Sequence, residues 1–172
     1  RLIADSLKTI PNKVKAVVCA SAIGWYGADP VIPSLKPFTE NDPADDAFLG
    51  ITCKKWEESI EPVTESGKRL VKLRTGIVLS KEGGALVEFK KPLKLGIAAI
   101  LGNGKQIISW IHIDDLVQLY IAAIENETMT GSYNAVAPIP VSNKELTIRL
   151  ARINKKFFIP VLILLLGFSS CV

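Results

Sequence analysis

The sequence predicts an α/β fold in which helices cover a partial parallel sheet. The pattern of apolar residues switches repeatedly between helical and extended periodicity along the chain, as it does in α/β domains. A short continuous apolar run at residues 15–20 is typical of a strand buried in a parallel sheet, and residues 70–79 predict a second buried strand. The chain has 172 residues, 48% of them apolar, which is enough for one domain with its own core.

The first part of the chain predicts a helix, a strand and a long loop. An amphipathic run at residues 2–10 indicates a helix that ends at Pro11-Asn12, before the first strand. Residues 27–47 are rich in Pro, Asp and Gly and predict a loop. Loops of this length in compact domains usually serve a function.

Residues 48–60 predict an amphipathic helix that Pro62 ends or kinks. Four residues recur at helical spacing and form the stripe that we expect to face the core: Leu49, Cys53, Trp56 and Ile60.

The remainder of the chain continues the alternation. After the second strand, Gly83-Gly84 breaks the chain before a helix at residues 86–93. A Gly-Asn-Gly turn at residues 102–104 leads into a strand at 106–111, which is rich in β-branched and aromatic residues.

The last helices have recognisable starts. Asp114 is placed to cap a helix that runs to residue 126, with a short strand at 133–136 after it. Ser142 and Glu145 match a capping box and predict a helix to residue 153. The apolar run at residues 157–168 is shorter than the roughly 20 residues that span a bilayer, so we expect a packed helix rather than a membrane anchor.

Charge and cysteine content exclude several classes of function. The net charge is +4, and acidic residues separate most of the basic ones, which is typical of a solvated surface rather than a nucleic-acid-binding face. Three widely spaced cysteines and a single histidine exclude a zinc site. The odd cysteine count, without a signal peptide, predicts a reducing, cytoplasmic location.

Several motifs, in this order, carry a resemblance to a known family. They are Ser21-Ala-Ile-Gly-Trp-Tyr-Gly27, Thr39-Glu40, Asp42-Pro43, Cys53-Lys-Lys-Trp-Glu57, Arg74-Thr-Gly-Ile-Val-Leu79, Gly102-Asn-Gly-Lys-Gln106, Trp110-Ile-His-Ile-Asp-Asp115 and Tyr133-Asn-Ala-Val-Ala137. Together they resemble the extended short-chain dehydrogenase/reductases, which include nucleotide-sugar epimerases and dehydratases. The residues in these motifs are more similar to those of an atypical subgroup called epimerase family proteins or NADP-dependent oxidoreductases. This resemblance covers residues 1–160.

The resemblance implies a Rossmann-type fold in which residues 1–80 form the C-terminal half of the cofactor domain. Residues 81–172 would form a mixed part that includes some of the small C-terminal substrate domain. The glycine-rich turn that holds a cofactor pyrophosphate at a helix N-terminus in this family is absent, because the Gly-x-Gly at 102–104 precedes a strand. We therefore expect a fragment, truncated at both ends, that binds a dinucleotide weakly.

The usual acid of the family is missing. Typical members place a Tyr and a Lys one helical turn apart, with a Ser at the end of the preceding strand, and the Lys cation lowers the pKa of the Tyr. The matching helix positions here are Leu49 and Cys53, and Leu49 cannot ionise. Cys53 is either a reactive thiol or a packed small side chain. Ser21 matches the strand-end Ser, with Ala22 as the alternative alignment.

The resemblance thus implies a set of site residues. Ser21 and Cys53 are the candidate catalytic residues. The candidate cofactor-binding residues are Ala20, Ser21, Cys53, Thr75, Gly76, Ile77 and Val78. The candidate substrate-binding residues are Trp25, Tyr26 and Trp110. His112 is expected to be structural, no metal is expected, and Arg74 either holds an anionic group or pairs with a neighbour.

Two functions follow from this reading. The first is an NAD(P)-dependent oxidoreductase or nucleotide-sugar epimerase, impaired as a fragment, with NADP as cofactor, NAD as the alternative and a small-molecule substrate such as a nucleotide sugar. The second is a cofactor-binding sensor or assembly protein without catalysis, because Leu49 and Cys53 replace the acid pair. Neither nucleic acid nor membrane is expected as a partner, and the oligomeric state is left open.

Overall fold

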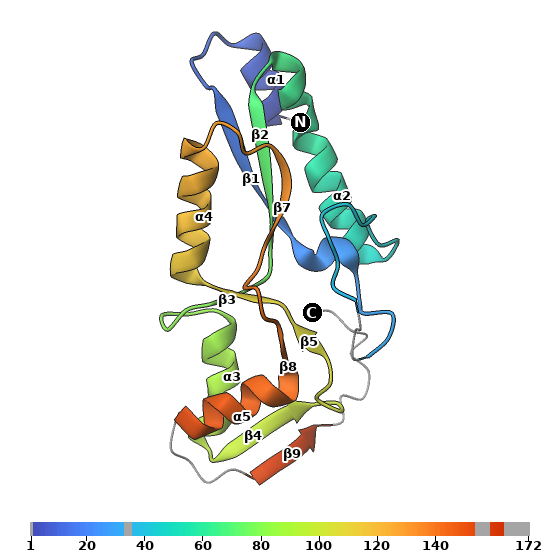
Figure 1. The fold of residues 1–172 in the computed structure, drawn as a ribbon, viewed down its shortest axis with the longest axis vertical. Coiled ribbons are helices and arrows are strands. Elements are labelled where there is room, and N and C mark those ends of the chain that lie inside the picture. The colour runs from blue at the N-terminus through green and yellow to red at the C-terminus, as the bar shows by residue number, and fades with distance from the viewer. Residues whose placement is uncertain (1, 33–35, 154–158, 164–172) are drawn as a thin grey trace. The chain divides into compact units, whose positions relative to one another are not determined.

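The chain divides into two compact units made of interleaved segments. The computed structural model describes residues 2–32, 36–153 and 159–163 (Figure 1). The first unit comprises Arg1–Gly27, Phe38–Gly76 and Asp114–Ala135, and the second comprises Ala28–Pro37, Ile77–Ile113 and Val136–Val172. Residues 114–135 belong to the first unit, because their strand completes its sheet.

The first unit contains a three-stranded sheet in which every pair is parallel, as the sequence predicts. The register aligns Ser21 with Arg74 and Arg74 with Asn134, near the carboxyl ends of the strands. Because residues in register on neighbouring strands share a face of the sheet, these three side chains lie on the same face. The strands, in sheet order, are β1 (Ala16–Ala22), β2 (Arg69–Thr75) and β7 (Gly131–Ala135).

Helices cover both faces of this sheet. Figure 1 shows α2 and α4 on opposite sides of the strands. Buried apolar residues from α1, α2, η2 and β2 form a core at the amino end of the strands: Ala4, Ile60, Val63 and Leu70. The helical segments are α1 (Leu2–Thr9), the 3-10 helices η1 (Ile23–Tyr26) and η2 (Glu61–Ser66), α2 (Phe48–Ile60) and α4 (Ile113–Glu125).

Helix α2 has the predicted bounds, and Cys53 and Ile60 are buried as predicted, but Trp56 is not. It ends at Ile60 and continues as η2, which has Pro62 at its start, in agreement with the sequence. Trp56 is 53% exposed, whereas Glu57 is only 4% exposed, so the prediction that Trp56 faces the core is wrong. A charged residue occupies that inward position because its partners lie on the sheet, as described below.

Among its described residues, the second unit contains three short strand pairs and two helices. Its buried cluster includes Leu93, Ile108 and Leu150. The backbone N–H of Glu145 donates to Ser142 Oγ (3.1 Å), which confirms the predicted helix start. The pairs are β3 (Ile77–Leu79) with β6 (Trp110–His112), β4 (Ile97–Leu101) with β9 (Ile159–Ile163), and β5 (Ile107–Ile108) with β8 (Val141–Ser142); the helices are α3 (Ala85–Lys94) and α5 (Asn143–Ile153).

Two predicted elements differ in the structure. The single strand expected at residues 70–79 is broken, because the Gly76 N–H donates to Ala135 O whereas the Ile77 N–H donates to Ser109 O. The helix expected at residues 157–168 is wrong over Ile159–Ile163, which form a strand beside β4; the rest of that run lies outside the described residues. Among the residues described, no helix is long and apolar enough to cross a bilayer.

Candidate functional site at the carboxyl end of the first sheet

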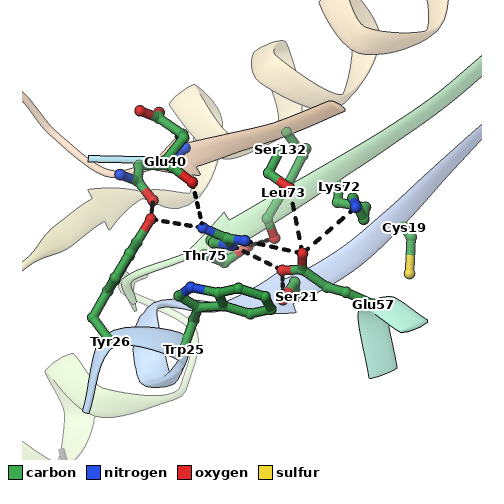
Figure 2. A network of polar contacts seen from close by, with 12 residues as sticks. Cys19, Ser21, Trp25, Tyr26, Glu40, Glu57, Lys72, Leu73, Thr75 and Ser132 are labelled. Atoms are coloured by element: carbon green, nitrogen blue, oxygen red, sulfur yellow. Dashed lines mark hydrogen bonds and ion pairs between the residues drawn. The ribbon is translucent and has the colours of Figure 1, made fainter. Parts of the chain in front are cut away.

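A buried carboxylate joins helix α2 to the sheet. Arg74 donates from Nε to Glu57 Oε1 (2.9 Å) and from Nη2 to Glu57 Oε2 (3.1 Å), which is a bidentate pair. Ser21 Oγ donates to the same Oε1 (2.7 Å). Ser21 is 5% exposed and Arg74 is 3% exposed, so this contact is shielded from water. Figure 2 shows Ser21, Lys72 and Ser132 around Glu57.

Further polar groups surround Glu57 and keep it ionised. Lys72 Nζ lies 3.7 Å from Glu57 Oε2 and 2.6 Å from Glu61 Oε2, and Ser132 Oγ donates to Glu57 Oε2 (3.3 Å). Burial raises the pKa of Glu57, but the hydrogen bonds from Arg74 and Ser21 and the nearby positive charges outweigh it. The pKa of Glu57 is therefore held below its usual value, and the group is a carboxylate at neutral pH.

The ionisation state of Glu57 determines which hydrogen bonds the Ser21 hydroxyl can form. A carboxylate only accepts hydrogen bonds, whereas a serine hydroxyl has one proton and two acceptor lone pairs. The proton shared by Ser21 and Glu57 therefore belongs to Ser21 and is directed at Glu57. In this arrangement the Ser21 hydroxyl can accept a further hydrogen bond but has no second proton to donate.

Arg74 pairs with its neighbours, which resolves the alternative left open by the sequence. In addition to its two bonds to Glu57, Nη1 donates to Tyr26 Oη (3.0 Å) and to Glu40 O (3.1 Å). The guanidinium carbon also lies 3.7 Å from the centre of the Trp25 ring. Burial lowers the pKa of Arg74, but the hydrogen bonds to Glu57 and Tyr26 raise it above its ordinary value overall. Arg74 is thus a buried cation with internal partners.

The aromatic residues predicted to bind substrate are held in place by the loop that follows them. Trp25 Nε1 donates to Asp42 O (3.0 Å). Tyr26 Oη donates to Asn134 Oδ1 (2.7 Å), and its ring stacks on Phe38 with centres 5.0 Å apart. The predicted loop is therefore ordered over residues 38–47 and tied to the strand ends, since Glu40 Oε1 also accepts a hydrogen bond from the Asn134 N–H (2.8 Å).

Cys53 lies in a packed environment one turn before Glu57 on α2. It is 3% exposed, and a Cβ placed on Gly24 would be 3.6 Å from Cys53 Sγ and 3.4 Å from Leu49 Cβ. Burial raises the pKa of Cys53, a hydrogen bond with the Ala22 backbone lowers it, and the net direction is upward. A raised pKa keeps the thiol protonated at neutral pH, which disfavours nucleophilic reactivity.

The predicted cofactor-binding residues fall on different faces and units. Ala22 is in register with Thr75, and strand alternation places Ala20 on the same face as these two. Ser21 and Cys53 lie on the opposite face, beside α2. Gly76 ends the first unit, whereas Ile77 and Val78 begin β3 in the second.

Trp110 is also in the second unit, where its Nε1 donates to Ile139 O (3.1 Å). His112, expected to be structural, lies in β6 in register with Leu79. The residues that the structure describes include no group of three or more His, Cys, Asp or Glu side chains able to hold a metal ion.

Sequence reasoning missed Lys72 and Ser132, which contact Glu57, and three further residues of the network. Glu57 is the central acceptor, Asn134 contacts Tyr26, and Glu40 contacts both Arg74 and Asn134. All three belong to motifs that carry the family resemblance. The sequence signal for Glu57 is its spacing of one helical turn from Cys53 and Ile60, which places a charged residue on the inward side of α2.

Comparison with known proteins shows homologues of this chain. No protein-family model matches the chain. The chain is 38% identical over 141 residues to an epimerase family protein of Mycobacterium bovis, a match that covers 81% of this chain and 45% of that protein. The chain is a homologue of the epimerase family proteins. It spans about half the length of the curated relatives that it matches.

Solved structures agree with this family. The nucleoside-diphosphate sugar epimerase of Corynebacterium glutamicum is 34% identical, with a TM-score of 0.79 over 91% of this chain and 34% of that one. A human epimerase family protein, solved with NADPH, is 28% identical, with a TM-score of 0.79 over 94% of this chain and 54% of that one. The predicted family resemblance and α/β fold are confirmed.

Proposed function

We propose that this chain forms part of an NAD(P)-dependent nucleotide-sugar epimerase or oxidoreductase of the epimerase family protein type. The observation that carries the proposal is its likeness to the nucleoside-diphosphate sugar epimerase described above, which is 34% identical with a TM-score of 0.79. NADP is the preferred cofactor because the human relative was solved with NADPH. The substrate is a small molecule, for which a nucleotide sugar is the leading candidate.

The carboxyl end of the sheet has the composition needed to hold a cofactor. Ligands of open α/β sheets bind outside the carboxyl ends of the strands. Ala20, Ala22, Thr75 and Gly76 lie at these ends, and their small side chains leave the backbone open to close approach. A bound nicotinamide cofactor would supply hydride transfer, and these residues would hold it beside the strand ends, together with the following Ile77 and Val78.

The proposed roles of the other residues follow from their contacts. Trp25 and Tyr26, in the first unit, form a wall for the substrate, and Trp110 is a separate substrate-binding candidate in the second unit. Cys53 and Ser21 keep their proposed catalytic roles, with Ser21 limited to accepting a hydrogen bond from a ligand hydroxyl or amide. The cysteine content supports a cytoplasmic location, and we expect no nucleic-acid or membrane partner.

The packing of Leu49 and Cys53 favours a second candidate, a cofactor-binding sensor or assembly protein without catalysis. Both side chains pack close to Gly24, and the thiol has a raised pKa. Neither of these positions therefore supplies a ready acid at neutral pH. This candidate predicts binding of the cofactor without turnover of any carbonyl or sugar substrate.

A thermal-shift titration with NADPH and NADH tests the cofactor proposal. It compares this chain with the longest natural polypeptide that contains it. A ligand that binds only the folded state stabilises it by about 2.7 kcal/mol at a hundredfold excess over Kd. Stabilisation of the longer polypeptide by NADPH supports cofactor binding, whereas no stabilisation of either chain contradicts it.

Turnover assays then separate the two candidates. We expect the longer polypeptide to convert a member of a nucleotide-sugar and carbonyl panel, and Cys53→Ala and Ser21→Ala to reduce that turnover. Cys19→Ala is the matched control, because Cys19 is a free cysteine on β1 that packs against the apolar core of Ala4, Ile60, Val63 and Leu70. Full turnover in both test variants would remove the roles given to Ser21 and Cys53. Cofactor binding without turnover of any substrate would favour the sensor.

A further inference from the structure

The Arg74 side chain joins helix α2, the aromatic pair and the loop. Its guanidinium contacts Glu57 on α2, Tyr26 on η1 and the backbone of Glu40. The same group lies over the Trp25 ring, 3.7 Å from its centre, and 5.4 Å from the centre of the Tyr26 ring (Figure 2). Both rings therefore contact one planar cation, in addition to the loop and Asn134.

The chemistry of this contact requires arginine. A guanidinium is planar, so it can stack on an indole while its edge forms a two-bond pair with a carboxylate. A lysine ammonium keeps the charge, but it is not planar and cannot form the paired hydrogen bonds of a guanidinium with a carboxylate. Glu57 fixes the orientation of the plane, because both of its oxygens are engaged by Arg74.

We propose that Arg74 is the positioning residue of the substrate wall, which it sets through Trp25 and Tyr26, and that Glu57 holds Arg74 in its working orientation. This inference rests on the proposed function for the identity of the ligand, a nucleotide sugar. Arg74 does not touch the ligand; it fixes the two rings against which the ligand binds. Loss of the guanidinium plane therefore weakens ligand binding more than it slows the chemical step.

A direct test follows the environment of Trp25 without any substrate. The chain has three tryptophans, and Trp56→Phe with Trp110→Phe leaves Trp25 as the only emitter. In that background we expect Arg74→Lys to shift the Trp25 emission and to increase its quenching by acrylamide. Unchanged emission and quenching in a folded Arg74→Lys chain would overturn the proposal.

A matched substitution controls for general loss of stability. Arg69 lies on the same strand and donates to the carbonyl oxygens of Ala123 (2.6 Å), Ile124 (2.8 Å) and Met129 (3.0 Å) at the other end of the sheet. We expect Arg69→Lys to lower stability but to leave the Trp25 signal unchanged. An equal change of the Trp25 signal in both variants would reduce Arg74 to a general structural role and contradict the proposal.

A second pair of measurements uses the longer polypeptide. Loss of a partly desolvated cation–π contact predicts that Arg74→Lys raises KM for the nucleotide sugar about tenfold, with a smaller change in kcat. If Arg74→Lys does not fold, Tyr26→Phe keeps the ring but removes the hydrogen bonds of Tyr26 Oη with Arg74 and Asn134, and the same KM effect is expected at smaller size. A fall in kcat with unchanged KM would overturn the proposal. Absence of turnover in the unsubstituted polypeptide would count against the proposed function, whereas the Trp25 measurement would still decide the role of Arg74.

Discussion

The two ends of the first sheet are built from the same strands but filled by different kinds of residue. At the amino end, Leu70 packs with Ile60 and Val63 in an apolar core. At the carboxyl end, the equivalent space between sheet and α2 holds the ion pair of Glu57 and Arg74. Helix α2 contributes to both, since Ile60 and Glu57 lie about one turn apart on its inward side.

This difference indicates that the two ends of the sheet have different roles. Apolar packing stabilises a fold and tolerates small rearrangements of the side chains. Buried charges carry a desolvation cost, and their attraction offsets it only when the geometry and the remaining hydrogen bonds are good. The network at the carboxyl end is therefore better explained by the geometry that it imposes on Trp25 and Tyr26 than by net stability.

The largest effect is expected from breaking the ion pair on one side. Glu57→Leu leaves Arg74 as a buried cation without its carboxylate, which should lower the free energy of unfolding by about 3–5 kcal/mol. The double variant Glu57→Leu/Arg74→Met removes both charges and should regain much of this loss. Urea denaturation followed by circular dichroism measures both. If the double variant were at least as unstable as the single one, the residues would not act as a pair.

A substitution in the apolar core at the amino end of the sheet should lower stability without affecting Trp25. Leu70→Ala removes a fully buried side chain and should lower the free energy of unfolding by about 3 kcal/mol, because it leaves a cavity that closes only in part. It should leave the Trp25 emission unchanged, since no ring of the substrate wall contacts this core. A shift of the emission in the folded variant would mean that the two ends of the sheet are coupled.

The contrast also explains which features could be predicted from the sequence. Helix α2 was predictable with its bounds because apolar spacing and Pro62 are local signals. The placement of Trp56 was predicted wrongly because hydrophobicity alone assigns it to the core. Glu57 takes the inward position on α2 only because Arg74, on strand β2, neutralises its negative charge. Such a partner depends on the three-dimensional fold and leaves no periodic pattern.

A similar limit applies to the strand at Ile159–Ile163 and to the site. A short apolar run does not distinguish a strand from a buried helix, and here the pairing with β4 decides it. The family motifs located Ser21, Trp25 and Tyr26 at the carboxyl end of the sheet. The hydrogen-bond direction at Ser21 could not be predicted, because it depends on the charge of Glu57.

The ionisation of Glu57 predicts a dependence of stability on pH. Its pKa is lowered in the folded chain, so its contribution is fully present above the unfolded value of 4.5 and is lost as the pH falls through the folded value. Glu57→Gln removes this titrating group. Urea unfolding between pH 7 and about pH 3 should therefore show a steeper loss of stability in the unsubstituted chain than in Glu57→Gln. Parallel curves would mean that Glu57 is not held ionised by the fold.

The smallest effect is expected at Trp56, and it tests the orientation of α2 on which the comparison depends. If the apolar stripe faced the core, Trp56→Ala would create a large cavity and cost about 3–5 kcal/mol. In the structure Trp56 is mostly exposed and Glu57 takes the inward position, so the free energy of unfolding should change by no more than about 0.5 kcal/mol. Urea denaturation distinguishes these values easily, and Ile60→Ala on the same helix provides the buried counterpart. A loss at Trp56 as large as at Ile60 would require α2 to be rotated, which would remove Glu57 from Arg74 and with it the basis for a positioned substrate wall.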